Sequence, residues 1–165
     1  MADMDTALPR KLNPDPILEA ILEIRFVPAV PPDALLGLVF GAVRDWFPQM
    51  IPLPTANLPE AVRSQDPNLA WQATHQLQGG HLSLKVGPRV LCFSSLRRYD
   101  GWPAWTAFRQ TVLERLVATG IFASVERLGL RYINFFRLPI LEHLNCEFTL
   151  VGSPVGNWSS TCRFE

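Results

Sequence analysis

The stretch Leu128-Gly129-Leu130-Arg131-Tyr132-Ile133-Asn134 decides the fold that this sequence predicts. Its side chains alternate between apolar and polar, which is the period of a β-strand with one buried face. The two faces carry Leu128, Leu130 and Tyr132 on the one hand and Arg127, Gly129 and Arg131 on the other. We therefore expect a strand over residues 124–136, with its apolar face in a core and its arginine face as a candidate ligand surface.

Other segments show the same alternation. Residues 17–26 place apolar side chains at every second position, with Glu19, Glu23 and Arg25 on the opposite face. Residues 71–78 and 81–86 flank the turn pair Gly79-Gly80 and predict a hairpin in which Leu77 faces Leu82. A third strand is expected over residues 89–95, with Leu91 beside Leu84 and Phe93 beside Leu82, and a short one over residues 146–150.

Two segments have helical periodicity. Prolines open and close the first, over residues 33–47, and Gly120 follows the second, which starts near residue 102. The segment between them, residues 48–69, is rich in proline and predicts a long loop with a short helical turn.

The order of these elements predicts an α+β fold, an antiparallel or mixed β-sheet with two helices packed on one face. We expect residues 1–16 to be a flexible tail and residues 17–165 to form a single domain. The helices should bury four aromatic side chains against strand residues that include Leu130 and Tyr132; these aromatics are Trp46, Phe47, Trp105 and Phe108.

The composition excludes some classes of protein. The chain has 165 residues, 48% apolar and 18% charged, so it can form a core. Fifteen basic and fifteen acidic residues balance, without the basic excess that is typical of nucleic-acid-binding proteins. Three scattered cysteines predict neither disulfides nor a zinc site, and no apolar run is long enough to span a bilayer. We expect a cytoplasmic protein.

No catalytic or metal-binding pattern stands out. His75 and His81 are expected on opposite faces of the hairpin, and His143 lies far away, so they cannot share a metal ion. Glu19 and Glu23 share a strand face, but no neighbouring residues predict a pocket that would raise the pKa of either carboxyl. An ion pair with Arg127 or Arg131 on an adjacent strand is the simpler expectation. We predict no cofactor, no metal and no catalytic residue.

Arginines are the best candidates for a binding site. Arg97 and Arg98 precede a helix start, where an anion could bind, and Arg25, Arg127 and Arg131 share the polar faces of two strands. Nearby aromatics could stack on nucleic-acid bases; they are Tyr99, Trp102 and Trp105. The alternative is that these aromatics belong to the core and that the arginines are ordinary surface residues.

Three segments resemble a known family. They are residues 13–26, the stretch from Tyr99 to Trp102 ahead of a helix, and the opening stretch of residues 128–134. The chain is similar there to a sporadically distributed bacterial family of conserved hypothetical proteins. The resemblance implies no activity, substrate or catalytic residue. Members of that family are longer, which implies a chain truncated at its C-terminal end.

Two functions follow as expectations. The first is a non-catalytic binding or interaction module of the bacterial cytoplasm, linked by association to mobile elements or defence loci. Its partner would be another protein or a second copy that pairs with an exposed sheet edge near Phe148 or Phe164. The second is a nucleotide- or nucleic-acid-binding protein, or an enzyme, that uses the arginine-rich sheet face.

Overall fold

The computed structural model describes residues 15–66, 69–96, 99–135, 149–150 and 153–154. Contacts divide the chain into two units, Met1–Phe135 and Phe136–Glu165. The first contains six strands and the helices: β1 (Ile17–Pro28), α1 (Pro32–Val43), β2 (Gln49–Pro52), the 3₁₀ turn η1 (Pro54–Asn57), α2 (Glu60–Gln65), β3 (His75–Gly79), β4 (Leu82–Gly87), β5 (Val90–Leu96), α3 (Trp102–Ala118) and β6 (Phe122–Asn134). The second contains the short antiparallel pair β7 (Thr149–Leu150) and β8 (Ser153–Pro154).

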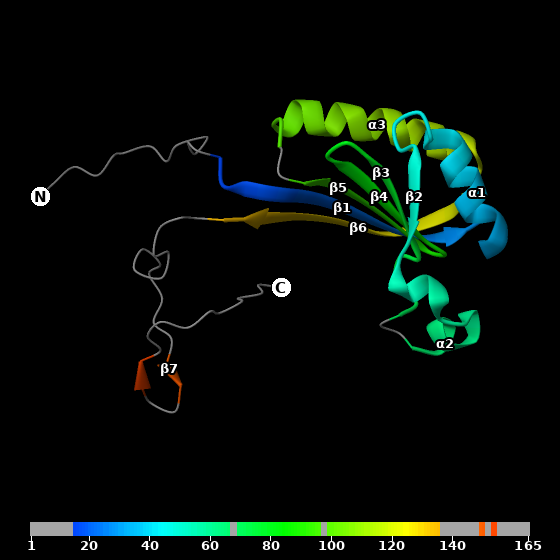
Figure 1. The fold of residues 1–165 in the computed structure, drawn as a ribbon, viewed down its shortest axis with the longest axis horizontal. Helices are drawn as coiled ribbons and strands as arrows, with labels where there is room; N and C mark the ends of the chain where they lie inside the picture. The colour runs from blue at the N-terminus through cyan, green and yellow to red at the C-terminus, as the bar shows by residue number, and fades with distance from the viewer. Residues whose placement is uncertain (1–14, 67–68, 97–98, 136–148, 151–152, 155–165) are drawn as a thin grey trace, which may run out of the picture. The chain divides into compact units, whose positions relative to one another are not determined.

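The six strands form one antiparallel sheet in the order β2-β3-β4-β5-β1-β6 (Figure 1). This confirms the predicted α+β class, with α1 and α3 as its two substantial helices. The first strand of the chain lies between β5 and β6, where Leu22 faces Phe93 on one side and Leu130 on the other. Residues far apart in sequence therefore meet across β1.

The core lies between α1, α3 and one face of the sheet. Leu35 and Val39 of α1 and Val112 of α3 pack with sheet residues such as Leu84 and Phe93. The predicted burial of Phe47 and Trp105 is confirmed, while Trp46 and Phe108 are half-buried and meet edge to face, with ring centroids 5.7 Å apart. The opposite side of the sheet is called the second face here; by register it carries Glu23, Arg25, Lys85, Arg127 and Arg131.

The hairpin prediction was wrong in its register by two residues. Leu77 faces Leu84, and Leu82 faces Gly79, because β3 continues to Gly79 and the turn lies at Gly80, whose φ is +59°. The same shift puts Phe93 beside Leu84 and Leu91 beside Val86. A shift of two leaves every side chain on its predicted face, since the strand period is two.

The segment predicted as a long loop with a short helical turn contains three elements: the strand β2, which was not expected, and the helical turns η1 and α2. All four residues of β2 are exposed, so the strand has no apolar alternation that could reveal it. Pro52 is tolerated because β2 is an edge strand. The first helix also ends at Val43, four residues earlier than expected.

The prediction that Leu128, Leu130 and Tyr132 are core residues was wrong for both leucines. Their exposed fractions are 67% for Leu128 and 47% for Leu130, and Tyr132 is half-buried. The cause is the place of β6 at the end of the sheet, beyond the strands that α1 and α3 cover. Strand alternation predicts the direction of a side chain and not how much covers it.

Some expectations lie outside the described residues: the tail up to residue 14, the pair Arg97 and Arg98, His143, the start of the strand over 146–150, and the edge at Phe148 or Phe164. In the parts of the chain that the structure describes, no helix is long and apolar enough to cross a membrane.

Candidate functional site

The structure brings together two of the arginines that the sequence suggested. Arg25 on β1 lies directly opposite Arg127 on β6, on the second face. Arg131 lies opposite Ile21, four residues further along β6 and therefore about 13 Å away. Arg97 and Arg98 are not among the described residues. The candidate set is therefore a row along β1 and β6, with Arg25 and Arg127 at one end.

Trp71, which the sequence did not single out, lies against this row. Its ring centroid is 5.2 Å from the Arg25 guanidinium and 4.4 Å from that of Arg89. Arg25 is paired with Glu23 at 2.8 Å, and Arg89 with Glu126 at 3.2 Å. Glutamates therefore already neutralise two of the cations, whereas both Arg127 and Arg131 are exposed.

The predicted cross-strand pairing of the glutamates is only half right. The strands β1 and β6 are neighbours, as the idea required, but Glu23 faces Gly129 and Glu19 faces Ile133. Glu23 pairs instead with Arg25, two residues away on its own strand. Residues two apart on a strand point the same way, so this pairing needs no second strand.

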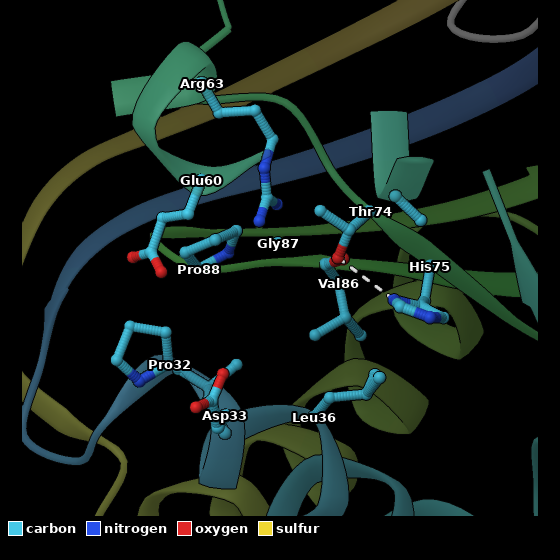
Figure 2. Close-up of a pocket in the computed structure, with 12 residues that line it drawn as sticks. Pro32, Asp33, Leu36, Glu60, Arg63, Thr74, His75, Val86, Gly87 and Pro88 are labelled. Atoms are coloured by element: carbon cyan, nitrogen blue, oxygen red, sulfur yellow. Dashed lines mark hydrogen bonds between the residues drawn. The ribbon is translucent and has the colours of Figure 1, made fainter. Parts of the chain in front are cut away.

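A polar cavity of about 250 Å³ lies where α1, η1 and α2 meet the start of β3 and the end of β4 (Figure 2). The N-terminal turn of α1 supplies Asp33, α2 supplies Glu60 and Arg63, and the start of β3 supplies His75. Figure 2 shows the Asp33 and Glu60 carboxylates and the Arg63 guanidinium pointing toward the space between them.

His75, which lines this cavity, has a pKa below the ordinary value of a histidine. Its Nδ1 lies 3.0 Å from the Thr74 hydroxyl, and burial, together with the nearby charge of Arg63, lowers its pKa. Burial lowers a histidine pKa because it disfavours the imidazolium form. The imidazole is therefore neutral near pH 7 and serves as a hydrogen-bonding group. Within the described residues, no cluster of His, Cys, Asp and Glu could hold a metal ion.

A second and larger hollow runs between α3 and β6. This groove, of about 600 Å³, is lined mainly by apolar side chains from three elements. They include Leu22 of β1, Trp102, Leu113 and Val117 of α3, and Leu130 of β6. Trp102 and Val117 are exposed like the β6 leucines, so apolar surface continues from the helix to the sheet edge.

Arg109 lies at the floor of this groove and is the most deeply buried cation of the described chain, only 4% exposed. Its Nη1 donates to the Trp105 carbonyl at 3.0 Å and its Nη2 to the Ser95 hydroxyl at 2.6 Å. The guanidinium stacks 3.9 Å from the Trp105 ring centroid, and burial lowers its pKa to about 10. Its Nε and the Trp105 Nε1 are buried without a hydrogen-bond partner.

Two tyrosines flank the same region. The hydroxyls of Tyr99 and Tyr132 are 3.3 Å apart and their rings meet edge to face. Burial, and then the hydrogen bond to Tyr132, raise the pKa of Tyr99, so that it keeps its proton. The charge of Arg109 opposes the rise in the pKa of Tyr99, and both tyrosines oppose the fall in the pKa of Arg109. The three groups are therefore close enough to interact electrostatically.

Sequence reasoning considered Tyr99 and Trp105 only as stacking aromatics and missed Arg109 entirely. Arg109 falls four residues after Trp105, on the stripe of α3 that faces the sheet. An arginine among apolar residues of a helix stripe was the signal that could have revealed it.

Comparison of the chain with models of protein families, with curated proteins and with solved structures finds no match. The family resemblance of residues 13–26 and 128–134 therefore stays a prediction.

Proposed function

We propose that this protein is a non-catalytic interaction module that binds an extended segment of a partner protein along β6. One observation carries the proposal. β6 has 13 residues and, among the described residues, pairs with β1 alone, while Leu128 and Leu130 lie exposed beside the apolar groove. The unpaired backbone groups of an edge strand are a template for a further strand, and apolar pockets beside it select alternate side chains.

The chemistry of β6 describes the segment that it would bind. In the bound segment, the residues opposite Leu128 and Leu130 would lie on the side of the groove and should be apolar. Residues opposite Arg127 and Arg131 lie on the second face, where acidic side chains would pair with the exposed cations. The proposed partner segment is therefore a strand with apolar residues on one side and acidic residues on the other.

Pairing of β6 with a second copy of itself is less favourable. In an antiparallel pair centred on Gly129, Arg127 of one copy lies opposite Arg131 of the other, and this happens twice. Like charges directly opposite each other destabilise a strand pair. An acidic partner removes this repulsion, which favours a different protein over self-association.

The test uses a peptide with the core Glu-Glu-Leu-Thr-Val-Glu, blocked at both ends and labelled with a fluorophore. When the peptide is aligned antiparallel to β6, its six residues lie opposite Tyr132 to Arg127 in that order. Its Leu and Val are then opposite Leu130 and Leu128, and its second and last Glu are opposite Arg131 and Arg127. We expect saturable binding by fluorescence anisotropy, weakened about tenfold or more by Leu130→Lys, since a charge would enter an apolar contact.

Two controls make this test specific. Leu38→Lys makes the same chemical change at an exposed leucine of α1 and should leave binding unchanged. A peptide of the same composition with Leu and Val adjacent loses the alternation and should bind weakly. Equal binding of the two peptides, or a dimer by light scattering that Leu130→Lys dissociates, would overturn the proposal.

A second candidate, a nucleic-acid- or nucleotide-binding protein, is favoured by one observation. Arg25 and Arg127 face each other, with Trp71 stacked on Arg25. A single-stranded oligonucleotide should then bind with an affinity that falls with salt, and Arg127→Gln should reduce it. Absence of binding at low salt would remove this candidate.

The proposed setting is the bacterial cytoplasm, beside genes of mobile elements or defence systems. The family resemblance of residues 13–26 and 128–134 supports it. The genes that flank this one in its genome test the proposed setting, which predicts mobile-element or defence genes among them. Flanking genes of neither kind would contradict it.

A further inference from the structure

The polar cavity of Figure 2 holds three charged side chains that have no partner within the described chain. Asp33 and Glu60 are exposed, Arg63 is half-buried, and all three point toward the space between them. The ion pairs of the described residues involve none of the three. The Nε of Arg63 is also buried without a hydrogen-bond partner. Two carboxylates and one guanidinium are therefore available to a ligand in this cavity.

Glu60 and Arg63 offer opposite charges side by side. They lie three residues apart on α2, a spacing at which helix side chains are neighbours with Cβ atoms about 5–6 Å apart. Opposite charges at this spacing commonly pair, yet these two side chains form no ion pair with each other. A ligand that carries an ammonium and a carboxylate close together can satisfy both. An α-amino acid has these two groups on a single carbon atom.

The charge and size of the cavity restrict the ligand further. Burial lowers the pKa of His75, so the imidazole is neutral near pH 7 and the two carboxylates outnumber the one guanidinium. A ligand with a second cationic group would balance this excess, whereas a phosphate dianion would face two carboxylates. The volume of about 250 Å³ lies just below the range of about 300–1,000 Å³ that is usual for ligand sites, which suits a small molecule.

We propose that this cavity binds a free α-amino acid with a basic side chain. Arg63 pairs with the α-carboxylate, Glu60 with the α-ammonium and Asp33 with the side-chain cation. Only a free amino acid has both α-groups charged, because a residue within a peptide chain has neither. The site is separate from the β6 edge and does not depend on the proposed function.

The experiment titrates the full 165-residue protein with L-arginine and follows the backbone amide signals by NMR. We expect saturable shifts at Thr74, His75 and Gly87, which line the cavity. Two analogues each remove one ligand charge: L-citrulline has a neutral urea in place of the guanidinium, and L-argininamide lacks the carboxylate. Each analogue should bind about fivefold more weakly, the factor that one partly exposed ion pair contributes.

Substitutions assign each ligand charge to its residue. Asp33→Asn should remove the preference for L-arginine over L-citrulline. Arg63→Met should reverse the preference for L-arginine over L-argininamide, because the carboxylate then faces only acidic groups. Glu60→Gln should weaken all three ligands to a similar extent, since each has an α-ammonium.

Two control variants make the same chemical changes outside the cavity. Glu19→Gln on β1 and Arg44→Met after the end of α1 should keep both preferences. Circular dichroism verifies that every variant folds, and the comparison of the three ligands on the natural protein requires no variant.

Two results would overturn the proposal. One is equal affinity of the natural protein for the three ligands, or shifts that spread over the protein without saturating. The other is no shift at Thr74 and His75 with L-arginine at about 10 mM, which would nearly saturate a site with a Kd of about 1 mM. Neither result bears on peptide binding at β6, which is measured separately.

Discussion

At the scale of single residues, direction and burial turned out to be separate properties. The alternation over residues 128–134 correctly placed Leu128 and Leu130 on the helix side of the sheet and Arg127 and Arg131 on the other. It could not tell that both leucines are exposed, because coverage depends on which strand ends the sheet. Arg109 was missed because its acceptors, Trp105 and Ser95, come together only in the folded chain.

The contrast between Leu84 and Leu128 predicts very different costs for the same substitution. Leu84 is fully buried in the core, so Leu84→Ala should lower the free energy of unfolding by about 2–5 kcal/mol. Leu128→Ala should change it by only about 0.5 kcal/mol, because little apolar contact is lost. Urea denaturation measures both. Comparable losses would mean that β6 is covered in solution.

The burial of His75 predicts a loss of stability in acid. Its pKa in the folded chain lies below the ordinary value of 6.5, so the unfolded chain binds a proton more readily. Above pH 6.5 the imidazole is mostly neutral in both the folded and the unfolded chain, so the pH has little effect on stability. As the pH falls from 6.5 toward the lowered pKa, the unfolded chain takes up a proton and the folded chain loses stability. The stability advantage of the natural protein over His75→Gln should therefore shrink between pH 8 and pH 5.

Thermal unfolding at both pH values measures this effect. His81→Gln, on the neighbouring turn and exposed, is the control for removing an imidazole. A gap between the natural protein and His75→Gln that stays constant or widens in acid would contradict the assigned direction.

At the scale of elements, the register of the β3–β4 hairpin and the existence of β2 could not be predicted from the sequence. The sequence predicted a hairpin at Gly79-Gly80, and the hairpin exists. Its register differs by two because Gly79 belongs to β3, where its backbone closely approaches Trp46 after the end of α1. β2 was invisible for a different reason, since an exposed edge strand has no apolar alternation.

This close approach makes Gly79 irreplaceable. A Cβ at Gly79 would collide with the carbonyl of Trp46, so Gly79→Ala should destabilise the fold by about 2 kcal/mol or more. Gly37 of α1 has open space around it, and Gly37→Ala should stabilise by about 0.5–1 kcal/mol through helix propensity. Chemical denaturation of the two variants gives the comparison, and a neutral Gly79→Ala would refute the contact.

At the scale of the whole sheet, the order of the strands creates the two hollows and keeps them apart. The cavity at His75 lies on β3, and β4, β5 and β1 separate it from β6, about 19 Å away at the usual strand spacing. The α+β class followed from element order, but the insertion of β1 between β5 and β6 did not. That insertion leaves β6 at the edge and gives the protein its proposed binding surface.

The most direct test of the central claim is hydrogen exchange of backbone amides, measured by NMR with and without the Glu-Glu-Leu-Thr-Val-Glu peptide. In the free protein, alternate amides of β6 that point away from β1 should exchange quickly. The account predicts that peptide binding slows these amides and shifts the signals of Trp102, Leu113 and Val117 along α3. Protection confined to β2, or binding that leaves β6 exchange unchanged, would contradict it.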